Sequence, residues 1–355
     1  MVGGTVSLTP GTSAADWVGR SVVVVGLGRA GLAAADALLE RGAGVSVLDP
    51  VDSPSARQRA ELLTRLDATV VPGDQSSDLP VCDLVVAGDW TPTAAVYRQA
   101  ERRGLPVWSD VELARHLAPD APARWLGLVG PGSALAANAL SAILRAAGLR
   151  PTQAGGAGRP IIEVLLDAAV FDAVVLDLSP AQLHWSNQLG LAAAAVLGSA
   201  PVPPWYDQAE RWPGRTTPTD PATAYQADLG KIYDQVVRAC LYNVADPAGQ
   251  RLVELADVVE GARAIGLTDG IPAVSMLGMV DDLLVDRAFI AQRHDSALEL
   301  VALGDLGLEP GNSQAVVAYL AAAGLARAYG VPALAVRDGL RQVAGPSAGE
   351  QGEMP

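Results

Sequence analysis

The sequence predicts an α/β protein of two domains, each built around a mostly parallel sheet. Two stretches carry this prediction, and each has the layout strand, glycine turn, helix. The first starts with the β-branched run 22–25, passes through a Gly-x-Gly-x-x-Gly turn and enters an Ala/Leu-rich segment. The second starts at 126–129, turns at 130–133 and enters another Ala/Leu-rich segment at 134–147. Short apolar runs of this kind are typical of parallel strands buried on both faces, and a chain of 355 residues commonly forms two domains.

The composition excludes several function classes. The net charge is −14, which disfavours nucleic acid and anionic membranes as partners. No apolar run reaches the ~18 residues of a membrane span, and the N-terminus lacks the pattern of a signal peptide. We therefore expect a cytoplasmic chain. Cys82 and Cys240 have no metal-site or disulfide spacing. The 25 basic residues include a single lysine, Lys231, so arginine would have to bind any phosphate.

The first glycine turn predicts a Rossmann-like nucleotide-binding domain at 21–120, after a loose lead-in at 1–20. A helix over 32–41 follows the turn, and a strand over 44–48 then ends at an acidic residue. In such a βαβ unit the glycines permit close approach, the helix N-terminus binds phosphate, and the acid accepts hydrogen bonds from a hydroxyl or a base edge. The binding residues predicted here are Gly26, Gly28, Arg29, Gly31 and Asp49. The alternative is a βαβ unit that keeps the fold and binds nothing.

The rest of this domain continues the alternation of strand and helix. The expected elements are strands at 69–71, 84–87 and 106–108, and helices at 60–65 and 93–103. Ser109 or Asp110 would cap a further helix. Residues 119–124 are rich in Pro and Ala and predict the link to the second domain, which we place at 121–343.

The second glycine turn has the layout of a phosphate-binding loop without its chemical groups. Such a loop needs Gly-x-x-x-x-Gly-Lys-Ser/Thr, in which the lysine reaches the terminal phosphates and the hydroxyl binds Mg²⁺. The positions after this turn are Ala134 and Leu135, which can do neither. Gly148 would end the helix that follows. We predict a degenerate phosphate loop made of Gly130, Gly132, Ser133, Ala134 and Leu135.

A carboxylate at the end of a later strand is another feature of this domain. Residues 171–176 predict a strand that ends at Asp177, and α/β folds bind ligands at such strand ends. A lone carboxylate is a weak metal signal, and the alternative is an Asp that caps a turn or helix. His184 is expected to be a packed or surface residue. The remaining elements expected are a helix at 161–167, an irregular surface loop at 201–212, a helix leading into a strand over 232–244, β structure within 280–301, helices at 312–329 and 332–342, and a disordered tail at 344–355.

Together these motifs resemble the Mur ligases of peptidoglycan synthesis, and among them the UDP-N-acetylmuramoyl-L-alanine:D-glutamate ligases (MurD). The first glycine turn and Asp49 match the family's glycine loop and its uracil-side acid, and 108–113 resembles its Trp-Gly-Asp-Val-Glu-Leu. The turn at 130–133 falls on its Gly-Thr-Asn-Gly-Lys-Thr/Ser loop. The stretch from Asp177 resembles its Glu-Leu-Ser-Ser-Phe-Gln-Leu motif. Its remnants in this chain are Ser179 and Gln182, with His184 close behind.

The resemblance implies a Mur-ligase-type central α/β domain with a mostly parallel sheet after the N-terminal Rossmann-like domain. It implies that the first domain binds UDP-N-acetylmuramoyl-L-alanine and that the second binds ATP and Mg²⁺. In the family a third domain follows and completes the ATP and D-glutamate sites. After the tail at 344–355 we expect that domain to be missing from this sequence, either natively or because the sequence is a fragment of a longer chain. Proteins of peptidoglycan synthesis or cell division are the expected partners.

The family's reacting groups are largely replaced in this chain. Its phosphate-loop lysine and hydroxyl fall on Ala134 and Leu135, and its carbamylated lysine falls on Leu229. Phosphoryl-transfer catalysis depends almost entirely on positioning and electrostatic stabilisation. We therefore expect no catalytic residue, no ATP or Mg²⁺ cofactor and weakened UDP-sugar binding. Further departures are Ala30 and Ala33 for hydroxyl donors, Trp90 in a Ser-Pro-Gly turn, 155–158 for Gly-Asn-Ile-Gly, Asp177 for a Glu, and Val202 and Pro203 for metal ligands.

Three hypotheses of function remain open. The first is a non-catalytic, MurD-like pseudo-ligase of peptidoglycan synthesis or cell division. The second is a ligase whose missing domain and charges come from a partner chain. The third is an NAD(P)-binding oxidoreductase, in which Asp49 would accept hydrogen bonds from ribose hydroxyls. The histidines disfavour the third, since they are scattered without a catalytic pattern at His116, His184 and His294.

Overall fold

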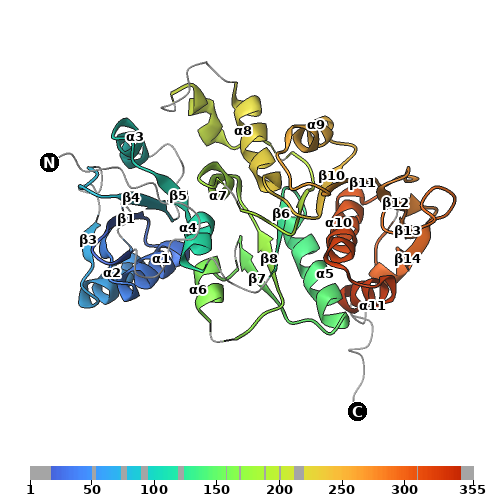
Figure 1. Ribbon diagram of the computed structural model, residues 1–355, viewed down its shortest axis with the longest axis horizontal. Coiled ribbons are helices and arrows are strands. Elements are labelled where there is room, and N and C mark those ends of the chain that lie inside the picture. Colours follow the sequence, from blue (N-terminus) through green and yellow to red (C-terminus); the bar gives the residue numbers. More distant parts are fainter. Residues whose placement is uncertain are drawn as a thin grey trace, which may run out of the picture.

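The chain folds into two sheets that lie side by side, each flanked by helices (Figure 1). The computed structural model describes residues 17–49, 53–72, 78–88, 95–118, 124–156, 158–167, 169–187, 189–199, 201–211, 220–309 and 311–344. The prediction of an α/β fold with an N-terminal Rossmann-like domain and a second, mostly parallel sheet is confirmed. The lead-in up to residue 16, the link at 119–123, Trp90 and the tail from 345 lie outside the described residues.

The first sheet is parallel throughout and has the order β3-β2-β1-β4-β5. Its strands are β1 (Ser21–Val25), β2 (Gly44–Asp49), β3 (Thr69–Pro72), β4 (Leu84–Ala87) and β5 (Val107–Ser109). Its helices are α1 (Arg29–Glu40), α2 (Pro54–Arg65), α3 (Ala95–Arg102) and α4 (Asp110–Leu117). The strand order reverses between β1 and β4, and ligands of such sheets bind in the crevice at this point.

The second sheet has the order β14-β13-β12-β11-β10-β9-β6-β8-β7. Neighbours from β7 through β12 are parallel, and β13 and β14 extend one edge with antiparallel pairs. Its strands are β6 (Arg124–Val129), β7 (Pro151–Gly155), β8 (Ala173–Asp177), β9 (Ala193–Val196), β10 (Ala239–Asn243), β11 (Arg263–Leu267), β12 (Met276–Val280), β13 (Leu283–Asp286) and β14 (Leu298–Ala302).

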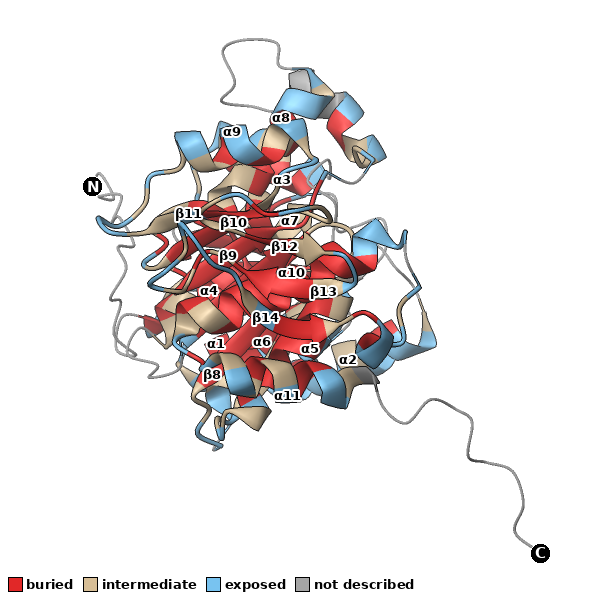
Figure 2. Ribbon diagram, turned by 90° about the vertical axis from the view of Figure 1, so that its right-hand side faces the viewer, coloured by how far each residue is buried: buried red, intermediate tan, exposed pale blue. Residues whose placement is uncertain are grey.

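The helices of this domain cover both faces of its sheet. The α-helices are α5 (Ser133–Ala146), α6 (Ile161–Leu166), α7 (Pro180–His184), α8 (Pro221–Gly230), α9 (Pro247–Leu255), α10 (Ser313–Tyr329) and α11 (Ala333–Ala344). The 3₁₀ helices are η3 (Pro204–Arg211), η4 (Lys231–Tyr233) and η5 (Gly304–Leu306). Leu126 and Leu128 of β6 pack toward α5 and α10, while Trp125 and Val129 pack in the cluster on the other face, as the alternation of a strand requires. Figure 2 shows this buried centre with exposed residues on the outer helices.

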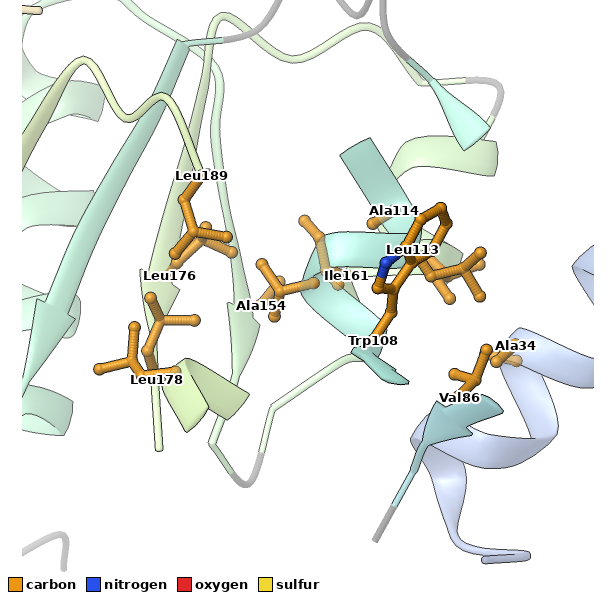
Figure 3. Close-up of a cluster of buried hydrophobic side chains, with 14 of the residues drawn as sticks. Ala34, Val86, Trp108, Leu113, Ala114, Ala154, Ile161, Leu176, Leu178 and Leu189 are labelled. Carbon is orange, nitrogen blue, oxygen red and sulfur yellow. The ribbon is translucent and has the colours of Figure 1, made fainter. Parts of the chain in front are cut away.

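One continuous apolar cluster joins the two domains. It contains Val86, Trp108 and Leu113 of the first domain together with Ile161 and Leu176 of the second (Figure 3). Polar contacts run along the same contact zone: the Ser109 amide donates to the Trp185 carbonyl at 2.9 Å, and the Asn187 amide donates to Glu112 at 3.0 Å. The domains therefore share a core and present a fixed contact between β5, α4 and the segment after α7.

Three local expectations were wrong. The segment expected as an irregular surface loop at 201–212 contains η3, and Tyr206 within it is fully buried. The helix expected from residue 232 is only the 3₁₀ turn η4, because Asp234 takes an extended backbone and Gln235 a φ of +58°; the strand expected after it is present as β10. The helix expected at 60–65 begins earlier, at Pro54, where the Ser53 side chain accepts from the Ala56 amide.

Candidate functional site

The first glycine turn is fixed by close backbone packing. Gly26 takes a φ of +101°, which favours glycine. A Cβ on Gly31 would lie 2.0 Å from the Gly26 carbonyl oxygen. A Cβ on Gly88, just after β4, would lie 2.9 Å from the Val25 carbonyl oxygen. The N-terminus of α1 is thus held closely against the ends of β1 and β4.

Asp49, the last residue of β2, is tied to this turn. Its side chain is 5% exposed, and Oδ2 accepts a hydrogen bond from the Leu27 amide at 2.8 Å. Arg59 of α2 donates to the Leu27 carbonyl at 2.6 Å. The carboxylate therefore organises the turn, and its contact with a ligand stays a prediction.

A cavity of about 390 Å³ opens between the two domains beside this turn, and we name it the interdomain cavity. Arg29, at the start of α1, contributes an exposed guanidinium, and the first turn of α1 carries no acidic residue. Arg159 approaches from the second domain and pairs with Asp167 at 3.1 Å. The full set of lining residues is Arg29, Ala30, Ala87, Gly88, Asp110, Gly155, Gly156, Gly158, Arg159, Pro160, Ser179, Ala181, Gln182 and Trp185. A helix N-terminus beside two arginines suits an anionic ligand.

Ser179 and Gln182 line this cavity and also build it. Ser179 is the N-cap of α7, and its hydroxyl accepts from the Gln182 amide while the Gln182 side chain accepts from the Ser179 amide. This reciprocal arrangement is a capping box. Gln182 Nε2 also donates to Asp110 Oδ1 at 2.9 Å, across the domain contact. The pair therefore fixes α7 against α4.

His184 lies outside the lining of the cavity and belongs to a buried charge cluster. Asp228 of α8 is 1% exposed, and its Oδ2 contacts His184 Nδ1 at 2.7 Å and accepts from the Tyr206 hydroxyl at 2.9 Å. Lys231 Nζ lies 3.2 Å from Asp228 Oδ1 and donates to the His184 carbonyl at 2.6 Å. Burial acts to raise the pKa of Asp228, but His184, Lys231 and Tyr206 together hold the pKa below its ordinary value. We name these four residues the Asp228 cluster.

The second glycine turn has the backbone of a phosphate loop. Gly130 and Gly132 take φ values of +106° and +85°, and α5 begins at Ser133. Ala134 is exposed at the first turn of that helix. The Ser133 hydroxyl donates a hydrogen bond to the Asp177 carboxylate at the end of β8. Burial raises the pKa of Asp177 by more than this hydrogen bond lowers it. Asp177 therefore faces the turn itself.

A second cavity, of about 440 Å³, lies beside Pro131, and we name it the loop-side cavity. Asp246 and Asp269 line it, and its described lining contains no Lys, Arg or His. Asp246 Oδ2 accepts from the Ser199 amide at 2.6 Å, and Asn243 donates to the Leu197 carbonyl at 3.1 Å. Asp246 and Asn243 thus bond to neighbouring protein atoms, and the net charge of the described lining is negative.

The described ranges lack two kinds of feature. No three His, Cys, Asp or Glu side chains gather there as metal ligands. No helix in the same ranges combines the length and apolar character needed to cross a bilayer.

Several residues of the site were missed from the sequence. Arg159, Trp185 and Asp228 come together with the predicted residues only through tertiary contacts. One local signal was available, since Ser-x-x-Gln before an apolar residue predicts a capping box at Ser179.

The chain is similar in sequence to named ligases. It is 42% identical over 331 residues to "UDP-N-acetylmuramoylalanine--D-glutamate ligase" of Streptomyces coelicolor, covering 92% of this chain and 67% of that protein. The protein of the same name from Streptomyces avermitilis is 41% identical over 328 residues, with the same coverage. The chain thus spans about two thirds of the length of these relatives. A family described as "Putative NAD(P)-binding" matches residues 14–110.

Two solved structures have a similar fold. The UDP-N-acetylmuramate:L-alanyl-gamma-D-glutamyl-meso-diaminopimelate ligase from Neisseria meningitides gives a TM-score of 0.51 at 14% identity, covering 91% of this chain and 98% of that chain. A murein peptide ligase from Psychrobacter arcticus gives 0.50 at 11% identity, covering 93% of this chain and 68% of that chain. At these identities the similarity concerns the fold alone.

Proposed function

Because the chain belongs to the family of UDP-N-acetylmuramoylalanine–D-glutamate ligases, we propose that it acts in peptidoglycan precursor synthesis by binding the family's UDP-sugar without ligating it. The ligand would be UDP-N-acetylmuramoyl-L-alanine in the interdomain cavity. ATP and Mg²⁺ would not bind, and the chain by itself would be a pseudo-ligase.

The opposite charge of the two cavities carries this proposal. The interdomain cavity brings Arg29, Arg159 and the N-terminus of α1 to one place. The one carboxylate in its described lining, Asp110, accepts from Gln182, and Arg159 also pairs with Asp167, so the lining keeps a net positive charge. The loop-side cavity brings Asp246 and Asp269 together, with no cation in its described lining. Two like charges 4 Å apart repel by about 1 kcal/mol in water and by more where water is excluded. A triphosphate is therefore disfavoured beside the second glycine turn, whereas a pyrophosphate is favoured beside the first.

The second glycine turn supports the loss of ATP chemistry. A lysine and a hydroxyl at its end would supply the charge and the Mg²⁺ ligand, and these positions hold Ala134 and Leu135. The Asp177 carboxylate accepts a hydrogen bond from the Ser133 hydroxyl of this turn and is thus already bonded within the protein. The residues present do not fit a Mg²⁺–triphosphate group.

Calorimetry and a product assay test the two halves separately. Titration of UDP-N-acetylmuramoyl-L-alanine should give micromolar binding, and Arg29→Met should weaken it about tenfold by removing a charge-assisted hydrogen bond. Arg145→Met is the matched control, since Arg145 is exposed on α5 and does not line either cavity. No binding by the wild type would refute the first half. Product that requires ATP, Mg²⁺ and D-glutamate would refute the second half, and product that appears only with an added partner chain would favour a split ligase.

A second candidate function is the binding of a nicotinamide dinucleotide, which the family match over 14–110 favours. Asp49 is 5% exposed and already accepts from Leu27, so little of the carboxylate is accessible to a hydroxyl of either ligand, and this residue does not separate the two candidates. A fluorescence titration with NADH separates the candidates. Saturable enhancement at micromolar NADH would favour the dinucleotide.

A further inference from the structure

We propose that Trp185 contacts the sugar half of the ligand in the interdomain cavity and contributes to its selection. This inference rests on the proposed function, namely that a UDP-sugar binds in that cavity. It assigns a role to a residue that sequence reasoning left without one.

The strand order of the first sheet fixes the direction of the ligand. Asp49 ends β2, the glycine turn follows β1, Gly88 follows β4, and Asp110 follows β5, so these sites lie in the order of the sheet. In such folds the nucleoside lies toward the β2 acid and the phosphates lie at the N-terminus of α1. The part of the ligand beyond the phosphates therefore extends past β4 toward β5.

Trp185 stands at that end of the cavity. Its carbonyl accepts from the amide of Ser109, the last residue of β5, at 2.9 Å. Its ring packs against Tyr97 of α3, with ring centroids 5.2 Å apart. Arg29 lies at the opposite end, after β1. The two residues are thus placed to meet different halves of one ligand.

The chemistry of Trp185 suits a sugar ring. It is the one aromatic side chain in the described lining of the cavity, whose other members are small, polar or charged. Its side chain is half-buried, so part of the ring faces the cavity. Aromatic rings combine a large apolar face with low conformational freedom, and they are common in ligand pockets for this reason.

The indole is held by packing and not by a hydrogen bond. Its Nε1 is buried and has no hydrogen-bond partner among the described residues. The His184 ring packs edge-on against the indole, with ring centroids 4.4 Å apart, and His184 is itself paired with Asp228. The ring is therefore positioned by its neighbours, and a small shift toward a ligand would break no hydrogen bond.

Calorimetry with two ligands tests the inference. UDP-N-acetylmuramoyl-L-alanine and UDP are titrated into the wild type, Trp185→Leu, Trp185→Phe and the control Trp125→Phe. Trp125 is buried on β6 and does not line the cavity. We expect Trp185→Leu to weaken the UDP-sugar about tenfold and to change UDP less than about twofold. Trp185→Phe keeps a ring and should stay within about threefold for both ligands, as should Trp125→Phe.

The outcomes distinguish this inference from the proposed function. If the wild type binds the UDP-sugar and Trp185→Leu binds it equally well, the inference is wrong while the proposed function stands. If Trp185→Leu weakens UDP and the UDP-sugar alike, Trp185 has only a structural role and the inference is again wrong. If the wild type binds neither ligand, both proposals fall. Circular dichroism and a thermal melt of each variant exclude loss of folding as the cause, and Trp185→Phe provides a conservative variant if Trp185→Leu unfolds.

Discussion

Replacing the central carboxylate of the Asp228 cluster should destabilise the second domain by about 2 to 3 kcal/mol. Asp228→Asn keeps the shape and one acceptor oxygen but removes the charge that His184, Tyr206 and Lys231 share. A hydrogen bond to a charged group contributes about 1.5 to 3 kcal/mol, and an unpaired buried partner costs about as much. Lys231 is 31% exposed and regains hydration when its partner is lost. The expected loss of unfolding free energy is therefore smaller than the sum for three fully buried contacts.

The same carboxylate predicts how the destabilisation varies with pH. The pKa of Asp228 is lowered in the folded chain, so its contribution is complete above the unfolded carboxyl value of about 3.9 and is lost as the pH falls through the folded value. The difference between wild type and Asp228→Asn should therefore be large at pH 7 and shrink below about pH 4.

Urea unfolding followed by circular dichroism measures both effects. Asp207→Asn is the matched control, because Asp207 is an exposed carboxylate on η3, and surface substitutions usually change stability by less than about 0.5 kcal/mol. An Asp228→Asn variant as stable as this control at pH 7 would refute the view that the ionised carboxylate holds α7, η3 and α8 together.

Three further predictions concern local features. Gly31→Ala should lower the unfolding free energy by about 3 kcal/mol or more, since its Cβ would lie 2.0 Å from the Gly26 carbonyl oxygen; wild-type stability in urea would contradict this contact. Burial raises the pKa of Cys82 and raises that of Cys240 to about 12. A disulfide reagent at pH 8 should therefore react with neither thiol until the chain unfolds. Rapid reaction of the native protein would contradict the burial of these two thiols. Ser179→Ala should cost about 1 kcal/mol by removing the cap of α7, whereas Ser179→Thr should retain most of it, and equal melts of the two variants would argue against the capping box.

The sequence by itself determined those features that depend on local sterics. Both glycine turns were predicted, and Gly26 and Gly130 indeed take positive φ values. The helix ends at Gly42 and Gly148 follow the same rule, with φ values of +78° and +77°. The β-branched run 22–25 became a central strand because such side chains suit a strand that is buried on both faces.

Segments that are fixed by distant partners could not be predicted. The stretch 201–212 was expected to be an irregular surface loop because it is rich in Pro and Trp. Tyr206 is nevertheless buried, since its hydroxyl donates a hydrogen bond to Asp228, which lies 22 residues later in the chain on α8. His184 likewise pairs with Asp228, which lies 44 residues later in the chain. No local pattern encodes such pairs, because their energy appears only when the two elements pack.

The residues of the candidate site also fall into those that the sequence identified and those that only the tertiary structure brought together. The sequence identified Arg29 and the glycine turn, because helix N-termini and close backbone approach leave local signatures. Only the tertiary structure placed Arg159 and Trp185 opposite them, on a second domain whose register against α4 is set by the shared apolar cluster. Likewise, the absence of a lysine from the second turn is read directly from the sequence, whereas the negative charge beside that turn arises when strand ends bring Asp246 and Asp269 together. Local conformation depends on neighbours in the chain, and a binding site depends on neighbours in space.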